Sequence, residues 1–179
     1  AARIALALRQ SVRNKAKELA ESINIPVWQD AAVKELAQHE RSPLILLSNY
    51  ATRLDDVASD SIIDSSEVLS QIGYAIAGEI SGSRVSCAFD EESIALIAEK
   101  LIGAKKPLVI AGSSAGDIDL IQAAANIARG LSERRGKPTN LCLTLPEVNS
   151  MGMTMMVDDG NTLGVALSKL ESGEAKKAI

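Results

Sequence analysis

Two short stretches combine small and polar residues in the way that a phosphate-binding turn requires. The first contains Gly112, Ser113 and Ser114, which follow the apolar segment 107–111 and precede a helical pattern. Small residues at such a turn let backbone amides approach a phosphate, and the N-terminus of the next helix attracts an anion. The spacing matches neither the Gly-x-Gly-x-x-Gly fingerprint nor a Walker loop, no lysine follows, and two acidic residues open the helix. An ordinary strand-to-helix connection is therefore favoured over a cofactor-binding turn.

The second stretch contains Asn149, Ser150 and Gly152, which come shortly after another apolar segment, 139–145. Polar side chains and glycine at the carboxyl end of a strand are typical of ligand grooves in α/β proteins. The same stretch carries methionines at positions 151, 153, 155 and 156. Because methionine adapts to irregular apolar surfaces, filling a gap or packing against a partner is favoured over ligand binding.

Other residues with chemical potential occur singly or in a context that favours a structural role. Asp55 and Asp56 could act as an acid–base pair or bind a cation. A solvated loop with a local ion pair to Arg53 is the favoured interpretation. His39, the single histidine, is interpreted as a surface residue near a helix end, and no Ser–His–Asp or Cys–His arrangement is predicted around it. We therefore expect no catalytic residue in this chain.

The two cysteines bear on metal binding. Cys87 and Cys142 stand far apart, and neither belongs to a Cys-x-x-Cys motif. A structural zinc site or an iron–sulfur cluster takes about four ligands at characteristic spacings. The sequence therefore predicts two free, buried thiols and no metal site.

Composition and charge exclude two classes of partner. The 179 residues include 19 basic and 23 acidic side chains, a formal charge of -4, and the two signs are mixed along the chain. Nucleic-acid binding would require clustered lysine and arginine with few compensating acids. No apolar run approaches the roughly 20 residues that cross a bilayer, so direct membrane insertion is not expected.

Because the chain starts at Ala1 without an initiator methionine, we expect a piece of a longer protein.

Hydrophobic periodicity predicts helices that alternate with short strands. The predicted helices cover 3–22, 26–38, 65–80, 90–103, 117–133 and 162–170, and the predicted strands cover 44–47, 107–111 and 139–145, with a loop over 146–160. Ser65, Ser66 and Asp90 are the residue types that cap helix N-termini. This order favours an α/β fold, a Rossmann-like parallel sheet with helices on both faces.

A break in the helical pattern near residues 81–86 predicts a weak division of the chain. Residues 1–82 would form a mainly helical part with one strand, and residues 83–179 a strand–loop–helix α/β unit. One continuous domain, truncated at its C-terminus, is the alternative. In that case residues 174–179 would begin a further strand.

Five segments, in order along nearly the whole chain, resemble one protein family. They are 7–20, 52–56, 103–126, 148–152 and 170–173. This succession is similar to the G subunit of bacterial NADH:quinone oxidoreductase, respiratory complex I. The resemblance implies a piece of the long C-terminal region of that subunit, which is itself similar to the molybdopterin oxidoreductases.

The resemblance also carries expectations about cofactors. In active molybdopterin enzymes the segment equivalent to 131–152 is usually rich in glycine and wraps the nucleotide end of the cofactor, whereas here most of those glycines are absent. We therefore expect no cofactor in this chain, and iron–sulfur clusters only elsewhere in the parent chain. The vestigial candidates for cofactor binding are Gly112, Ser113, Ser114, Asn149, Ser150 and Gly152.

The role implied by the resemblance is structural. The chain would be a cofactor-less domain of the peripheral-arm iron–sulfur subunit, supporting electron transfer from NADH to quinone. Its partners would be the other subunits of the arm and the rest of its own chain, at the cytoplasmic side of the bacterial inner membrane. The alternative is a nucleotide- or dinucleotide-binding domain of a molybdopterin- or thiamine-dependent enzyme, because residues 104–116 also resemble the central domain of thiamine-diphosphate enzymes.

Overall fold

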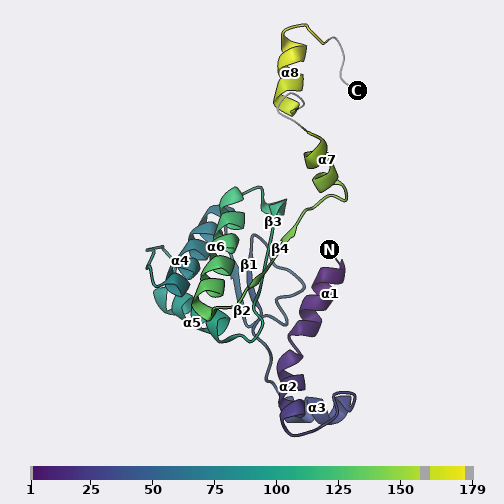
Figure 1. The fold of residues 1–179 in the computed structure, drawn as a ribbon, viewed down its shortest axis with the longest axis vertical. Coiled ribbons are helices and arrows are strands. Elements are labelled where there is room, and N and C mark those ends of the chain that lie inside the picture. The colour runs from purple at the N-terminus through teal and green to yellow at the C-terminus, as the bar shows by residue number, and fades with distance from the viewer. Residues whose placement is uncertain (1, 158–161, 176–179) are drawn as a thin grey trace.

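The computed structural model describes residues 2–157 and 162–175, and it has a mixed α/β structure (Figure 1). Positions 158–161 of the predicted loop and 176–179 of the predicted C-terminal strand lie outside the described residues. The elements, in chain order, are α1 (Ala2–Ser11), α2 (Asn14–Ser22), α3 (Asp30–Ala37), β1 (Ile45–Ser48), β2 (Asp60–Ile63), α4 (Ser66–Ser81), α5 (Glu91–Gly103), β3 (Leu108–Gly112), the 3-10 turn η1 (Ser113–Ala115), α6 (Ile118–Arg135), β4 (Asn140–Thr144), α7 (Ser150–Met156) and α8 (Leu163–Glu171).

Helices α4, α5 and α6 form the apolar core. Their amphipathic stripes bring Ile76, Ile97 and Leu131 into one cluster of buried side chains. Gly73 of α4 allows α6 to approach closely, since a Cβ atom built on it would lie 2.9 Å from the Cβ of Ala123. The core is therefore made by helix-on-helix packing with small residues at the contact.

Side-chain caps determine where two of these helices begin, as predicted. The Ser65 hydroxyl accepts a hydrogen bond from the Val68 amide at 3.4 Å, and the Asp90 carboxylate accepts one from the Ser93 amide at 2.9 Å. The bond from Ser93 lowers the pKa of Asp90, because it stabilises the charged form of the carboxylate.

The strands form two parallel pairs. β1 pairs with β2 in the register of Ile45 to Asp60, and β3 pairs with β4 in the register of Leu108 to Asn140. The parallel strand pairs and the surrounding helices confirm a mixed α/β structure, although of the two pairs only β3 and β4 are connected by a helix, while a loop without a helix connects β1 to β2. A single Rossmann-like sheet is not confirmed, because no ladder joins the two pairs among the described residues. β2 lies where the sequence predicts no strand, since two of its four residues are polar.

The N-terminal helix differs from the prediction. A single helix over 3–22 is wrong, because the structure has α1 and α2 with a break between them. Ser42, distant in sequence, occupies this break. Its amide donates to the Val12 carbonyl at 2.9 Å, and its hydroxyl accepts from the Lys15 amide at 3.0 Å. Backbone groups left free by the interruption are thereby satisfied.

Two further elements differ from the predictions. α3 begins at Asp30 rather than near Pro26, and α7 forms within the predicted loop 146–160. α7 and α8 extend beyond β4, away from the helical core (Figure 1). The core itself draws on residues from 72 to 131. Separate folding of residues 1–82 and 83–179 stays a prediction.

One ion pair attaches β2 to the core. Asp60, the first residue of β2, accepts hydrogen bonds from the Lys100 ammonium of α5 at 2.9 and 2.7 Å. Burial alone would raise the pKa of Asp60, but the hydrogen bonds from Lys100 and Ser59 outweigh it, so this pKa lies below its usual value of 3.8. The stabilisation is therefore present above about pH 4 and is lost as the pH falls through the lowered pKa.

We expect Asp60→Asn to lower the free energy of unfolding at pH 6 by about 1 kcal/mol, since the pair is only partly exposed. At pH 3 the difference from the parent chain should shrink. Urea unfolding at both pH values measures it. The control is Asp30→Asn, which breaks the exposed pair with Lys34 and should lower stability much less. Equal losses for Asp60→Asn at pH 6 and pH 3 would contradict the linkage.

Candidate functional site

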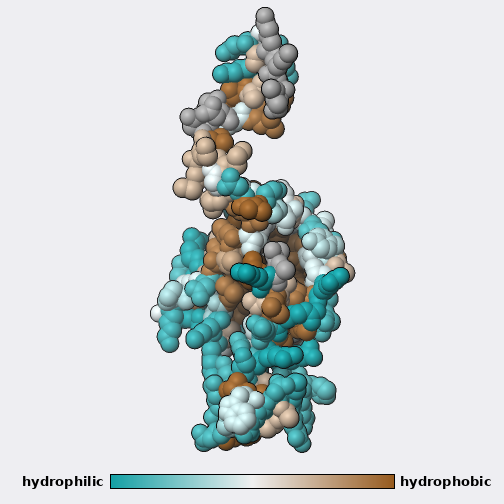
Figure 2. Space-filling view, turned by 90° about the vertical axis from the view of Figure 1, so that its right-hand side faces the viewer, coloured by the Kyte–Doolittle hydropathy of each residue, from teal (hydrophilic) through white to brown (hydrophobic). Residues whose placement is uncertain are grey.

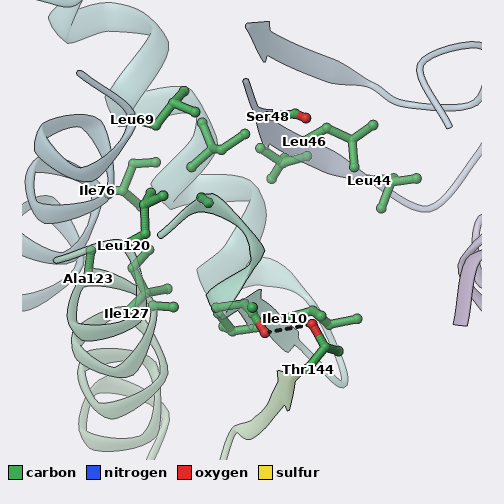
Figure 3. Close-up of a pocket in the computed structure, with 18 of the residues that line it drawn as sticks. Leu44, Leu46, Ser48, Leu69, Ile76, Ile110, Leu120, Ala123, Ile127 and Thr144 are labelled. Carbon is green, nitrogen blue, oxygen red and sulfur yellow. Dashed lines mark hydrogen bonds between the residues drawn. The ribbon is translucent and has the colours of Figure 1, made fainter. Parts of the chain in front are cut away.

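A cleft of about 650 Å³ separates β1 from β3 (Figure 3). Both strands line it along their whole length, with Leu44 to Tyr50 on one side and Leu108 to Gly112 on the other. Its floor comes from α4, α5 and α6, and Leu8 of α1 also contacts it. In the space-filling view, hydrophobic side chains gather around a hollow in the central part of the molecule (Figure 2).

The lining of the cleft is apolar except near the carboxyl ends of the two strands. Figure 3 shows Leu69 and Ile76 of α4 and Ala123 and Ile127 of α6 facing the space between the strands. Ser48, Asn49, Tyr50, Gly112, Ser114 and Thr144 supply its polar groups. No lysine, arginine, aspartate or glutamate belongs to the lining in the described part of the chain. The cleft is therefore suited to an uncharged, largely apolar occupant.

Gly112 serves strand packing at this site. A Cβ atom on Gly112 would lie 2.4 Å from the Thr144 hydroxyl oxygen, so the space beside Gly112 is taken by the neighbouring strand. That hydroxyl donates to the Ala111 carbonyl at 3.2 Å. Ser114 lines the cleft, and Ser113 begins the 3-10 turn that follows β3. Of the first predicted stretch, the structure places Gly112 and Ser114 in the cleft.

The N-terminus of α6 carries negative charge. The Asp117 carboxylate accepts a hydrogen bond from the Asp119 amide at 2.8 Å, which caps the helix with an acid. The Tyr74 hydroxyl lies 3.3 Å from both Asp119 and Gln122. Burial and then the Asp119 charge raise the pKa of Tyr74, so the phenol stays neutral. A phosphate approaching this helix end would meet two carboxylates.

The second predicted stretch does not reach the cleft. Asn149, Ser150 and Gly152 lie at the start of α7, and their polar groups are used locally. The Ser150 hydroxyl donates to the Glu147 carboxylate at 2.6 Å. The Asn149 side chain folds over Gly152, where a Cβ atom would lie 2.4 Å from its oxygen. The two predicted stretches therefore do not form one site.

The pair predicted between Arg53 and a neighbouring aspartate is wrong. Asp56 pairs instead with Arg9 of α1 at 2.6 Å, and Arg9 also donates to the Arg53 carbonyl. Asp55 accepts hydrogen bonds from the Ser61 hydroxyl and the Thr52 amide, and these lower its pKa. The loop thus connects α1 to the β1–β2 pair.

The histidine and the two cysteines lie at least partly in solvent. His39 is exposed, as predicted. Cys87 and Cys142 are free thiols but only half-buried, so full burial is wrong. Within residues 2–157 and 162–175, no group of three or more metal-binding side chains is found.

The polar cleft residues at the carboxyl end of β1 are not among the predicted site residues. Ser48 and Asn49 close the predicted strand without a glycine-rich turn, so no motif identifies them. Only the general rule that ligands bind at the carboxyl ends of parallel strands would have indicated them.

Among the described residues, no helix is both long and apolar enough to cross a bilayer.

Comparison with known proteins relates the whole chain to part of a larger one. No family model matches the sequence. The G subunit of NADH-quinone oxidoreductase from Pseudomonas putida is 44% identical over 183 residues, and that from Pseudomonas fluorescens is 42% identical over 183 residues. Each alignment covers 100% of this chain and 20% of the relative. The Escherichia coli K12 protein of the same name is 38% identical over 182 residues, which cover 99% of this chain and 20% of the relative.

The chain thus spans about one fifth of the length of the relatives that it matches. Identity at this level over the full length of the chain establishes common descent, and the relatives share one name. Over its whole length, the chain is therefore homologous to one part of the NADH-quinone oxidoreductase G subunits.

Proposed function

We propose that the chain is a structural, cofactor-less part of the peripheral-arm iron–sulfur subunit of NADH:quinone oxidoreductase. In this role it supports electron transfer from NADH to quinone by packing, without chemistry of its own. Its contacts are with the rest of its own subunit and with other subunits of the arm. The names of the full-length relatives support the assignment.

The observation that carries the proposal is the apolar surface left uncovered around β4, α7 and α8. Met155 and Met156 are 80% and 81% exposed, and Leu143 and Leu163 are 57% and 76% exposed. A monomeric protein seldom leaves so many large apolar side chains together in solvent, and such surfaces mark contacts with other protein. Methionines on α7 are suited to an irregular partner surface.

The proposal also includes the fold family of the region and the location of the subunit in the cell. We assign the chain to a Rossmann-like, molybdopterin-oxidoreductase-like region whose remaining strands come from elsewhere in the subunit. Iron–sulfur clusters belong to other parts of the parent chain. The subunit is peripheral and lies at the cytoplasmic side of the bacterial inner membrane.

The proposal predicts that Met155→Glu with Met156→Glu, made in the full-length subunit, lowers the amount of assembled complex at least about tenfold, because two charges would be buried in a contact. Native gels of solubilised membranes measure assembly, and NADH:quinone activity per assembled complex should stay at the parental value.

A matched control carries the same charge change on exposed residues of α6. Ala125→Glu with Arg129→Gln also lowers the net charge by about two, and both positions face solvent. Assembly of this variant should equal that of the parent. If the methionine variant assembles normally, α7 is not a contact surface and the packing role fails.

The alternative nucleotide-binding function rests on the position of the cleft beside the carboxyl ends of β1 and β3. Titration calorimetry of the full-length subunit with NAD, FAD, ADP and guanine nucleotides tests it. Micromolar binding that is lost in Asn49→Leu would favour this function over a purely structural one. We expect no heat of binding.

A further inference from the structure

The cleft between β1 and β3 is bounded by strand edges. Side chains of successive strand residues point to opposite faces of a sheet. A cavity beside one face would therefore contact only alternate residues. Here every residue of β1 and every residue of β3 contacts the cleft. The cleft accordingly lies along the edges of these strands, where backbone amides and carbonyls are exposed.

Those two edges have no hydrogen-bonded partner in the described part of the chain. β1 pairs only with β2 and β3 only with β4, and no backbone hydrogen bond joins β1 to β3. Unpaired strand edges beside an apolar surface raise the free energy of the folded chain, because buried backbone amides and carbonyls require hydrogen-bond partners. The two free edges face each other across a space floored by helices (Figure 3).

The sequences of these strands indicate deeper burial than they have here. The run from Leu44 to Leu47 is continuously apolar, which is typical of a strand covered on both faces. Yet no residue of the four strands is buried, and Leu108 is 50% exposed. Fully buried side chains occur instead on the helices. Burial of these strands therefore requires additional protein packed against them.

The chemistry of the cleft selects the class of occupant. Its floor is formed by leucine, isoleucine and alanine, and its lining has no charged side chain in the described residues. A phosphorylated ligand would find no counter-charge there. An extended peptide with apolar side chains would place its backbone between the two free edges and its side chains against α4 and α6.

We propose that the cleft is a strand position, filled in the native subunit by an extended apolar segment from outside these 179 residues. This inference rests on the proposed function, in which the chain is one fifth of a longer subunit. The inserted segment would come from the other four fifths of that subunit, which the relatives contain. The inserted strand pairs with β1, with β3, or with both, and converts edge strands into interior ones. The backbone ladder supplies affinity, and the apolar floor selects the side chains of the inserted segment.

Residue-resolved hydrogen exchange of the full-length subunit tests the proposal. Amides of successive residues in a strand point to opposite edges, so an edge strand leaves every second amide free. If β3 is interior, the successive amides of Val109, Ile110 and Ala111 all exchange at least about a hundredfold slower than free amides. If every second amide of both β3 and β1 exchanges at the free rate, the strand position is empty and the proposal is wrong.

Photo-crosslinking identifies the occupant. A diazirine amino acid replaces Leu46 in the full-length subunit, and the crosslinked peptide is sequenced. The proposal requires a peptide of the same polypeptide from outside the 179 residues. A peptide from a second copy, a peptide from another subunit, or no peptide would overturn it. The same label at Leu96, which is 50% exposed on α5, is the control and should not capture that peptide.

The two tests separate this inference from the proposed function. Both use the purified full-length subunit, so loss of the strand position is seen even when assembly with other subunits is normal. Conversely, a subunit that fails to join the complex can still show three protected amides in β3. Protection without assembly would reject only the proposed function, and assembly without protection would reject only the strand position.

Discussion

Replacing Leu131 by alanine is expected to lower the free energy of unfolding by about 3 kcal/mol, within the range for buried leucines. Leu131 is 0% exposed and packs in the cluster that joins α4, α5 and α6. The substitution removes buried methyl groups and leaves a cavity that closely packed helices fill only in part. Equilibrium urea unfolding, followed by far-ultraviolet circular dichroism, measures the change in midpoint.

The matched control for this substitution is Leu96→Ala on α5. Leu96 is 50% exposed, and leucine and alanine both favour helices. We expect a loss below about 1 kcal/mol, since only part of the side chain leaves an apolar environment. Equal losses at the two positions would mean that Leu131 is not in the core and that the packing described for α6 is incorrect.

Replacing Gly73 by valine is expected to destabilise the chain by about 3 kcal/mol, at the upper end of overpacking effects. The contact between α4 and α6 has no space for a side chain at this position, because a Cβ atom would lie 2.9 Å from that of Ala123. The helices must separate, and contacts along both of them weaken. Thermal and urea unfolding measure the loss.

Two companion variants make this prediction specific. Ala123→Gly removes the opposing methyl group, so adding it to Gly73→Val should restore part of the lost stability. Gly103→Ala, at the open end of α5 with no atom within 4 Å of the new Cβ, should raise stability by about 0.5 kcal/mol. Additive losses in the double variant would show that the two positions are not in contact.

The fold follows from the sequence where it depends on near neighbours. Ser65 and Asp90 cap their helices as predicted, because an N-cap bonds an amide three residues ahead. β3 is found within one residue of its predicted range, since its apolar run is bounded by proline and glycine. The helix predicted over 3–22 is interrupted because Ser42, remote in sequence, satisfies the exposed backbone.

The candidate site is less accessible to prediction. The sequence indicates Gly112 as a residue where a phosphate could approach backbone, but in the structure Thr144 of the adjacent strand occupies that space. The partner of Asp56 is Arg9 rather than the nearby Arg53. Each difference arises from a contact between residues more than thirty positions apart, for which no local pattern carries a signal.

Local patterns in the sequence are enough to establish most of the helices, their caps, the α/β class and the resemblance to one subunit of a respiratory enzyme. These depend on periodicities and turns that span a few residues, and on the order of short segments. Which strands pair, and which of their edges stay free, emerges only from the folded chain. Strand pairing joins distant segments, and its register depends on backbone groups that are the same in every residue. For that reason the apolar runs of β1 and β3 indicate that these strands are buried, but only the folded chain shows that a cleft lies between them.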